Sequence, residues 1–394
     1  AIKHSPLRDL SMPPDKRRKT NYGNWKPFSI HSQQNNLRKM ENRLPRIAIT
    51  QGDTNGIGFE LIFKALEDPT ILELCTPIIY GSPKVAAYHC KALNIQSNFS
   101  IINNAEDIVD GRINLMATTD EDIKVELGIA NELAGEAGLQ AIDKALEDYQ
   151  AGVFDALVTA PLENNKVFQF SGQGRYIADH IDSYNNEFTM LVSDSLRIAL
   201  ATRYLPLKQV VENITKEAIT NKLENLSKSL QRDFRISNPR VALLSLNPKA
   251  GENGLLGTEE QEILTPAINK LNENDVHVFG PYATDSFFGS EDWQAFDGIL
   301  ALYYDQGVTP FKYLNDNERA CFTAGLPLVH TFPITNGCLE LAGKNEADAC
   351  SLRYSIFLAI DLFRNRIEYD TPMENPLKKL YKEKREDRMP KKKE

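Results

Sequence analysis

The strongest constraint on the fold is a regular alternation of strand-like and helix-like segments from about residue 45 to residue 366. Short apolar runs, typical of buried strands, lie at 46–51, 76–81, 154–161, 196–202, 240–248 and 298–304. Segments with apolar residues at helical spacing lie at 59–68, 132–152, 258–274 and 348–366. This alternation predicts an α/β fold with a largely parallel sheet, and the 394 residues suffice for about two domains.

The two ends of the chain differ in composition from the alternating region. Residues 1–43 are mostly polar and basic and lack hydrophobic periodicity, so we expect a disordered extension. Met40 stands just before the first strand, and a start of translation there is one interpretation of the extension. Residues 371–394 form a charged tail, for which we favour a solvated arm over a contact with nucleic acid or anionic lipid.

The overall charge and the cysteines exclude several classes of protein. The net charge of −9 opposes general binding of nucleic acid, which is itself a polyanion. The five cysteines are widely spread and include no C-x-x-C pair, which indicates reduced thiols rather than a disulfide framework or a zinc site. Because the sequence shows neither a membrane span nor a signal peptide, we expect a cytoplasmic protein without a membrane partner.

Two glycine-containing loops follow predicted strands. The loop GDTNGIG (52–58) lacks the phase of G-x-G-x-x-G and the Lys-Ser/Thr of a P-loop, so we interpret it as a tight turn into a helix. The loop NPKAGENG (247–254) precedes a helix whose N-terminal amides could meet an anion. Phosphate binding and an ordinary loop are both open interpretations of this second segment.

The end of the strand predicted at 298–304 is a candidate functional site. The strand ends in Tyr303 and Tyr304, followed by Asp305, and strand ends line the ligand crevice of α/β sheets. No His or Cys stands beside these residues, and the chain contains neither an H-x-x-x-H pair nor a G-x-S-x-G elbow. The sequence therefore predicts a site here without a local histidine metal centre.

Eight segments of the chain match, in order and approximate spacing, the motifs of one enzyme family. They are RIAITQGDTNGIGFEL, LVTAPL, FSGQGRYIA, LRIALATRYLPL, RVALLSLNPKAGENGLLGTEE, GPYATDSFF, ALYYDQGVTPFKY and LELAGKNEAD. Over about residues 45 to 365 the chain thus resembles the 4-hydroxythreonine-4-phosphate dehydrogenase family of vitamin B6 synthesis. Several motifs together are far more specific than one glycine loop.

The resemblance implies a fold, an assembly and a reaction. The implied fold is isocitrate/isopropylmalate dehydrogenase-like, with one α/β domain at 44–172 plus 342–370 and a second, carrying the dimer interface, at 173–341. The implied assembly is a homodimer with active sites at the subunit interface. The implied reaction is NAD-dependent oxidation of a small phosphorylated hydroxy amino acid, assisted by a divalent metal and followed by decarboxylation, in pyridoxal phosphate synthesis.

The three histidines that the family places around its metal are replaced. The family motifs T-T-H-x-P-L, N-P-H-A-G-E and Y-H-D-Q-G have Tyr204, Lys249 and Tyr304 at the histidine positions. A phenol binds a metal well only after losing a proton with a pKa of about 10, and an ammonium repels a dication. We therefore predict a divergent member that binds no divalent metal in the family manner.

Most substrate contacts implied by the resemblance are also changed. Gln173 and Gly174 replace the His and Thr of G-H-T-E, and Cys321 and His330 replace an Asn and an Arg. Only Lys312 is unchanged among the contacts that can be placed. The remaining candidates are Asp285 and Asp305 for the site, and Asn247 and Gly251 for NAD binding.

These replacements leave three hypotheses. In the first, a metal-independent or altered-substrate dehydrogenase uses Lys249 as the cation and a neighbouring phenol, Tyr204 or Tyr304, as a general base with lowered pKa. In the second, the chain is a catalytically inactive relative that serves as a ligand-binding or regulatory dimer. In the third, the family reaction persists with a relocated metal held by His180 or His330.

Overall fold

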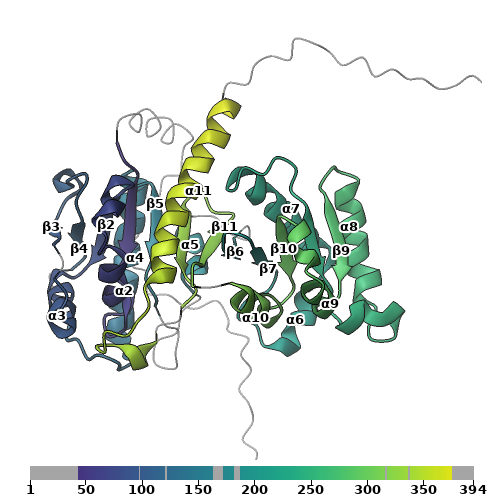
Figure 1. Cartoon of the computed structure of the whole chain (residues 1–394), viewed down its shortest axis with the longest axis horizontal. Coiled ribbons are helices and arrows are strands. Elements are labelled where there is room, and N and C mark those ends of the chain that lie inside the picture. The colour runs from purple at the N-terminus through teal and green to yellow at the C-terminus, as the bar shows by residue number, and fades with distance from the viewer. Residues whose placement is uncertain are drawn as a thin grey trace, which may run out of the picture.

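The structure is a computed structural model that describes residues 43–96, 98–119, 122–162, 172–181, 187–315, 317–335 and 338–374. The expected N-terminal extension and C-terminal tail lie outside the described residues, except for Arg43 and residues 371–374. The described chain forms one sheet with helices on both faces (Figure 1), so the predicted α/β fold is confirmed.

Twelve strands form a single continuous sheet. In sheet order they are β3 (Ser100–Ile102), β4 (Asn114–Ala117), β2 (Thr76–Gly81), β1 (Arg46–Thr50), β5 (Ala156–Thr159), β12 (Val329–Pro333), β11 (Ala320–Ala324), β6 (Phe188–Val192), β7 (Arg197–Leu200), β10 (Gly298–Ala301), β8 (Val241–Leu244) and β9 (Val278–Tyr282). Eight neighbouring pairs are parallel, as predicted. The three antiparallel pairs join β12, β11, β6 and β7, so an antiparallel centre connects two parallel halves.

The helices lie on the two faces of this sheet. They are α2 (Gly58–Ala65), α3 (Pro83–Leu93), α4 (Glu132–Gln150), α5 (Gln173–His180), α6 (Leu207–Asn213), α7 (Lys216–Arg232), α8 (Thr265–Asn272), α9 (Thr284–Gly289), α10 (Tyr304–Leu314) and α11 (Cys350–Glu374). The long helix α11 contacts β12, β11 and β5 as well as α2 and α7, and Figure 1 shows it between the two halves of the sheet. No helix among these described elements has the length and apolar character needed to cross a membrane.

The hydrophobic core differs between the two faces, and this difference positions the site. On one face, apolar side chains from α2, α7, α8 and α11 pack against both halves of the sheet in one core. On the other face the core is divided, with α4 and α5 over one half and α9 and α10 over the other. A gap in the packing between α5 and α10 follows from this division.

The end of β10 differs from the sequence prediction. A strand was expected to reach residue 304, but β10 ends at Ala301 and α10 begins at Tyr304. Buried Gln306 explains the change, because its side chain accepts a hydrogen bond from the Leu302 amide (2.7 Å) and donates to the Ser245 carbonyl (2.6 Å). The D-Q-G segment thus fixes the turn from strand to helix, and Tyr304 lies in the first helical turn.

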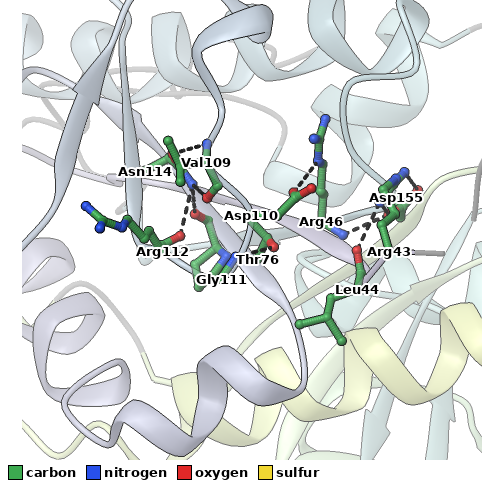
Figure 2. A network of polar contacts seen from close by, with 11 residues as sticks. Arg43, Leu44, Arg46, Thr76, Val109, Asp110, Gly111, Arg112, Asn114 and Asp155 are labelled. Atoms are coloured by element: carbon green, nitrogen blue, oxygen red, sulfur yellow. Dashed lines mark hydrogen bonds and ion pairs between the residues drawn. The ribbon is translucent and has the colours of Figure 1, made fainter.

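A polar network holds the first described residues of the chain to the sheet (Figure 2). The Arg43 guanidinium makes two hydrogen bonds to the Asp155 carboxylate, at 2.7 and 3.0 Å, and the Arg46 amide donates to the same carboxylate at 2.8 Å. The Arg46 side chain reaches Asp110 at 3.1 Å. The Asp155 side chain is buried at the edge of the sheet where β1 and β5 begin. There its carboxylate accepts hydrogen bonds from β1 and from the residue Arg43 that precedes β1.

Candidate active site

A cavity of about 620 Å³ lies in the gap between α5 and α10. Its walls come from the carboxyl-end residues Thr159 and Pro161 after β5, from Gln173 at the start of α5, and from Asp305 and Val308 in α10. Apolar side chains of the sheet centre complete it: Leu191, Leu200, Cys321 and Phe332. The cavity therefore lies where the antiparallel centre meets the two parallel halves, as expected for a ligand crevice in an α/β fold.

Buried polar side chains form a directional hydrogen-bond chain behind the cavity. Thr323 Oγ1 lies 2.9 Å from His330 Nδ1, and His330 Nε2 lies 2.9 Å from Thr159 Oγ1. Thr159 donates to the Gln173 side-chain oxygen, and the Gln173 amide donates to the Ala160 carbonyl at 2.9 Å. Since Thr159 uses its proton on Gln173, it accepts from His330, which fixes the imidazole with its proton on Nε2.

His330 is neutral in this environment. Its side chain is fully buried, and burial lowers its pKa to about 3, with the neighbouring Arg203 guanidinium acting in the same direction. The ring stacks on Phe332 with centroids 5.3 Å apart. His330 therefore serves as an internal hydrogen-bonding group at neutral pH.

The structure brings Tyr204 and Tyr304 together at the cavity. Their ring centroids are 6.2 Å apart, and both residues line the cavity. Burial raises the pKa of Tyr304, and Tyr204 and Cys321 add to this rise more than Arg203 opposes it. The direction is opposite to the lowered phenol pKa that the first hypothesis requires.

Arg203 is a lining residue that the sequence analysis missed. Its guanidinium donates to Thr189 Oγ1 and to the Tyr204 hydroxyl, both at 2.6 Å. The signal was present in TRYLPL, where a basic residue directly follows the strand predicted at 196–202.

Lys249 does not join the two tyrosines in the cavity wall. It lies in the turn η4 (Pro248–Gly254), its side chain is 69% exposed, and its ammonium is 3.5 Å from the Glu252 carboxylate. The backbone from Lys249 to Asn253 is left-handed throughout, with φ between 44° and 75°. This turn directs Lys249 toward solvent in the described chain.

The two candidates for NAD binding make internal contacts in the same region. The Asn247 amide and side chain donate to Glu260 at 2.8 and 3.0 Å, and its side chain also donates to Glu259 at 2.7 Å. A Cβ on Gly251, whose φ is 75°, would lie 2.7 Å from the Glu260 carboxylate. Both residues therefore stabilise the turn around buried Glu260, and their role in cofactor binding stays a prediction.

Of the remaining predicted site residues, some line the cavity and others lie outside it. Asp305 lines the cavity, whereas Asp285 in α9 and Lys312 in the last turn of α10 are exposed and lie outside its lining. Gly174 in α5 packs against β11, because a Cβ there would lie 2.9 Å from Thr323 Oγ1. Of the predicted site residues, the cavity thus collects Tyr204, Tyr304, Asp305 and Gln173.

The GDTNGIG loop is a packed structural turn. Asp53, Thr54 and Asn55 are buried, and the Asn55 side chain donates to the Ile129 carbonyl at 2.9 Å. A Cβ on Gly58 would lie only 2.0 Å from the Gln51 carbonyl oxygen. This contact agrees with our interpretation of the loop as a tight turn into α2.

Comparison with known proteins identifies the family to which this chain belongs. Residues 73–359 match the family model of the pyridoxal phosphate biosynthetic protein PdxA. The chain is 47% identical to a 4-hydroxythreonine-4-phosphate dehydrogenase of Bacteroides thetaiotaomicron, over 88% of this chain and 97% of that protein. This chain belongs to the PdxA family.

Other relatives and solved structures agree with this assignment. A 4-hydroxythreonine-4-phosphate dehydrogenase of a Sulfurihydrogenibium species is 34% identical over 82% of this chain and 99% of its own length. The crystal structure of the enzyme of the same name from Klebsiella pneumoniae matches with a TM-score of 0.69 at 27% identity, covering 81% of this chain and 99% of that chain. The Burkholderia phymatum enzyme matches with a TM-score of 0.66 at 28% identity, covering 82% and 99%.

The divalent metal implied by resemblance to the PdxA family does not fit the side chains found here. The three positions hold two phenols and an exposed ammonium, which are poor donors for a divalent ion near neutral pH. Among the described residues, no group of three or more His, Cys, Asp or Glu side chains is placed to hold a metal ion. His330 already uses both ring nitrogens, and His180 Nδ1 bonds the Tyr176 carbonyl at 2.7 Å.

Proposed function

We propose that this protein is a divergent dehydrogenase of the PdxA family that oxidises a small phosphorylated hydroxy acid with NAD and without a divalent metal. The observation that carries the proposal is the 620 Å³ cavity, which combines an arginine, two tyrosines and a carboxylate at the sheet centre. Family membership supports the reaction class, because the relatives are dehydrogenases of a phosphorylated hydroxy amino acid. A cavity of this size suits a small ligand of that class.

The residues of the chain have distinct parts in this proposal. An alcohol that is oxidised loses a hydride and its hydroxyl proton, and NAD when bound accepts the hydride. Asp305 accepts the proton, because it is the only carboxylate among the described residues that line the cavity. Tyr304 keeps its proton and donates a hydrogen bond to the ligand, which agrees with its raised pKa.

NADH formation over a panel of phosphorylated hydroxy acids in the presence of EDTA tests the proposed function. We expect turnover of at least one member of the panel at a rate that EDTA does not change. Absence of turnover with every substrate, with and without added divalent metal, would contradict the proposal.

A second candidate is a non-catalytic, ligand-binding dimer. It is favoured by one observation, the position of Lys249, which leaves the first hypothesis without the cation near the two tyrosines. The two candidates differ in the panel assay, because a ligand-binding protein would bind a phosphorylated hydroxy acid without producing NADH.

We also propose a homodimer located in the cytoplasm. The half of the sheet that was expected to carry the dimer interface exposes large apolar side chains, among them Leu207 at 70%, Val211 at 50% and Leu255 at 79%. Such side chains are typical of surfaces that associate. The cysteines, all described, are free thiols, which agrees with a reducing compartment. The division into two domains stays a proposal, because the sheet is continuous across both halves.

A further inference from the structure

Arg203 lines a second cavity as well as the first. This second cavity, of about 500 Å³, is lined by residues of α5, β6, β7, α7 and β11. The two cavities share Thr189, Leu200, Arg203 and Tyr204 as lining residues. The Arg203 side chain therefore belongs to the wall between them.

The Arg203 guanidinium has hydrogen-bonding capacity that the described residues leave unused. Of its five N–H groups, one bonds Thr189 and one bonds Tyr204. Its Nε is buried and has no hydrogen-bond partner within the part of the chain that the structure describes. Among the described residues no carboxylate lies within ion-pair distance of Arg203, so its two remaining terminal N–H groups and its positive charge are left for a ligand.

Two aromatic rings hold this guanidinium in place. Its central carbon lies 4.3 Å from the centroid of the Tyr204 ring and 5.4 Å from that of Phe332. Stacking and the two hydrogen bonds fix the orientation before a ligand arrives, which reduces the entropy lost on binding.

The second cavity has more positive than negative charge. Among the described residues, its lining contains Arg175, Lys222 and Arg203 against the single carboxylate of Glu187. Arg175 pairs with Glu187 at 2.9 Å, whereas the Lys222 ammonium donates to the Glu187 backbone carbonyl at 2.8 Å. Two cations, Lys222 and Arg203, are therefore not neutralised by carboxylates of this lining, and their field favours an anion at the shared wall.

We infer that Arg203 binds the anionic group of the ligand, a phosphoryl or carboxylate oxyanion, at the wall shared by the two cavities. A planar guanidinium with free N–H donors matches the oxygens of such a group in a fork geometry. The identity of the whole ligand rests on the proposed function, but binding of the oxyanion by Arg203 does not.

Titration calorimetry with inorganic phosphate tests this inference on the full chain. The variants are Arg203→Met, Arg203→Lys, and Arg240→Met as a matched control on an exposed arginine that stacks on Phe279 and Phe296. We expect Arg203→Met to weaken phosphate binding about ten- to a hundredfold, Arg203→Lys to weaken it less, and Arg240→Met to leave it unchanged. Circular dichroism checks that each variant is folded.

Equal phosphate affinity in the wild type and in both Arg203 variants would overturn the inference, as would absence of phosphate binding to the wild type. Where turnover is found, KM values for a phosphorylated hydroxy acid and its unphosphorylated analogue separate the two oxyanions. If Arg203→Met raises KM about tenfold over the wild type for the phosphorylated compound alone, with kcat within about threefold, Arg203 binds the phosphoryl group. If the KM values of both compounds rise equally, Arg203 binds the carboxylate. If no substrate turns over, the proposed function fails, and the phosphate titration still decides the role of Arg203.

Discussion

Tyr204 and Tyr304 stand one hundred residues apart in the chain, yet their rings lie 6.2 Å apart at an angle of 30° across the cavity. Tyr204 follows β7 with a left-handed backbone (φ 53°), and Tyr304 opens α10 after β10, the neighbouring strand. The pair therefore arises because two adjacent parallel strands end at the same edge of the sheet. Its members replace two of the three histidines that the resemblance places around a metal.

Tyr304 and Asp305 should have separable effects on the reaction. Because burial raises the pKa of Tyr304, its phenol stays protonated at neutral pH and does not act as the base. We expect Tyr304→Phe to keep kcat within about threefold, and Asp305→Asn to lower it about a hundredfold or more. Rates of NADH formation at pH 7 measure both, and a larger loss in Tyr304→Phe than in Asp305→Asn would reverse the assignment.

His330 should make the fold sensitive to acid. Its pKa is about 3 in the folded chain against an ordinary value of 6.5, so the unfolded state binds more protons between these two pH values. Stability contributed by the neutral ring is complete above pH 6.5 and falls as the pH decreases, by about 2 kcal/mol at pH 5. Urea unfolding at pH 7 and pH 5 measures the loss, and His330→Gln should show a smaller one. The same loss in both proteins would assign the acid sensitivity to other groups.

Asp155 should contribute strongly to stability where β1 begins. Its buried carboxylate accepts hydrogen bonds from the Arg43 side chain and the Arg46 amide. We expect Asp155→Ala to lower the free energy of unfolding by about 2 to 3 kcal/mol, because the charged Arg43 guanidinium and the Arg46 backbone amide lose their partner. The control is Asp122→Ala, which removes an exposed ion pair with Lys84 and should change stability by less than about 1 kcal/mol. Equal effects of the two variants in urea unfolding would argue against the network.

Gly58 tests whether the GDTNGIG loop is structural. An added Cβ at Gly58 would lie 2.0 Å from the Gln51 carbonyl oxygen, whereas one at Gly289 would meet no atom within 4 Å in the described structure. We expect Gly58→Ala to lower the free energy of unfolding by about 3 kcal/mol and Gly289→Ala to be neutral or slightly stabilising. A Gly58→Ala protein with unchanged stability but altered NAD affinity would instead indicate a nucleotide-binding loop.

The sequence predicts most of the fold because the apolar runs of the strands and the helical spacing of apolar residues are local patterns. The apolar runs of β1, β2, β5, β7, β8 and β10 are buried strands, and α4 and α11 begin within two residues of the helices predicted at 132–152 and 348–366. The antiparallel centre was not predicted, because its pairing of β11 with β6 joins segments that are distant in sequence. The predicted helix 258–274 begins instead with a π-turn at Glu260–Leu264, where Glu260 turns inward to bind the Asn247 amide.

The site was predictable only in part. Gln173, Tyr204, Tyr304 and Asp305 were found because they stand in segments that resemble the family motifs. The hydrogen bond between His330 and Thr159 was missed, because β12 and β5 are far apart in sequence and become neighbours only in the folded sheet. Lys249 was expected beside the tyrosines from its motif alone, and the left-handed turn that exposes it has no clear sign in the sequence.

Zinc titration of the purified, metal-free protein tests directly whether the wild type lacks the metal site of its family. A Tyr204→His, Lys249→His, Tyr304→His triple variant provides the comparison, since it restores the three imidazoles of the family motifs. We expect no stoichiometric zinc binding to the wild type in calorimetry and metal analysis. One tightly bound zinc ion per wild-type chain, lost on substitution of Tyr204 or Tyr304, would contradict it.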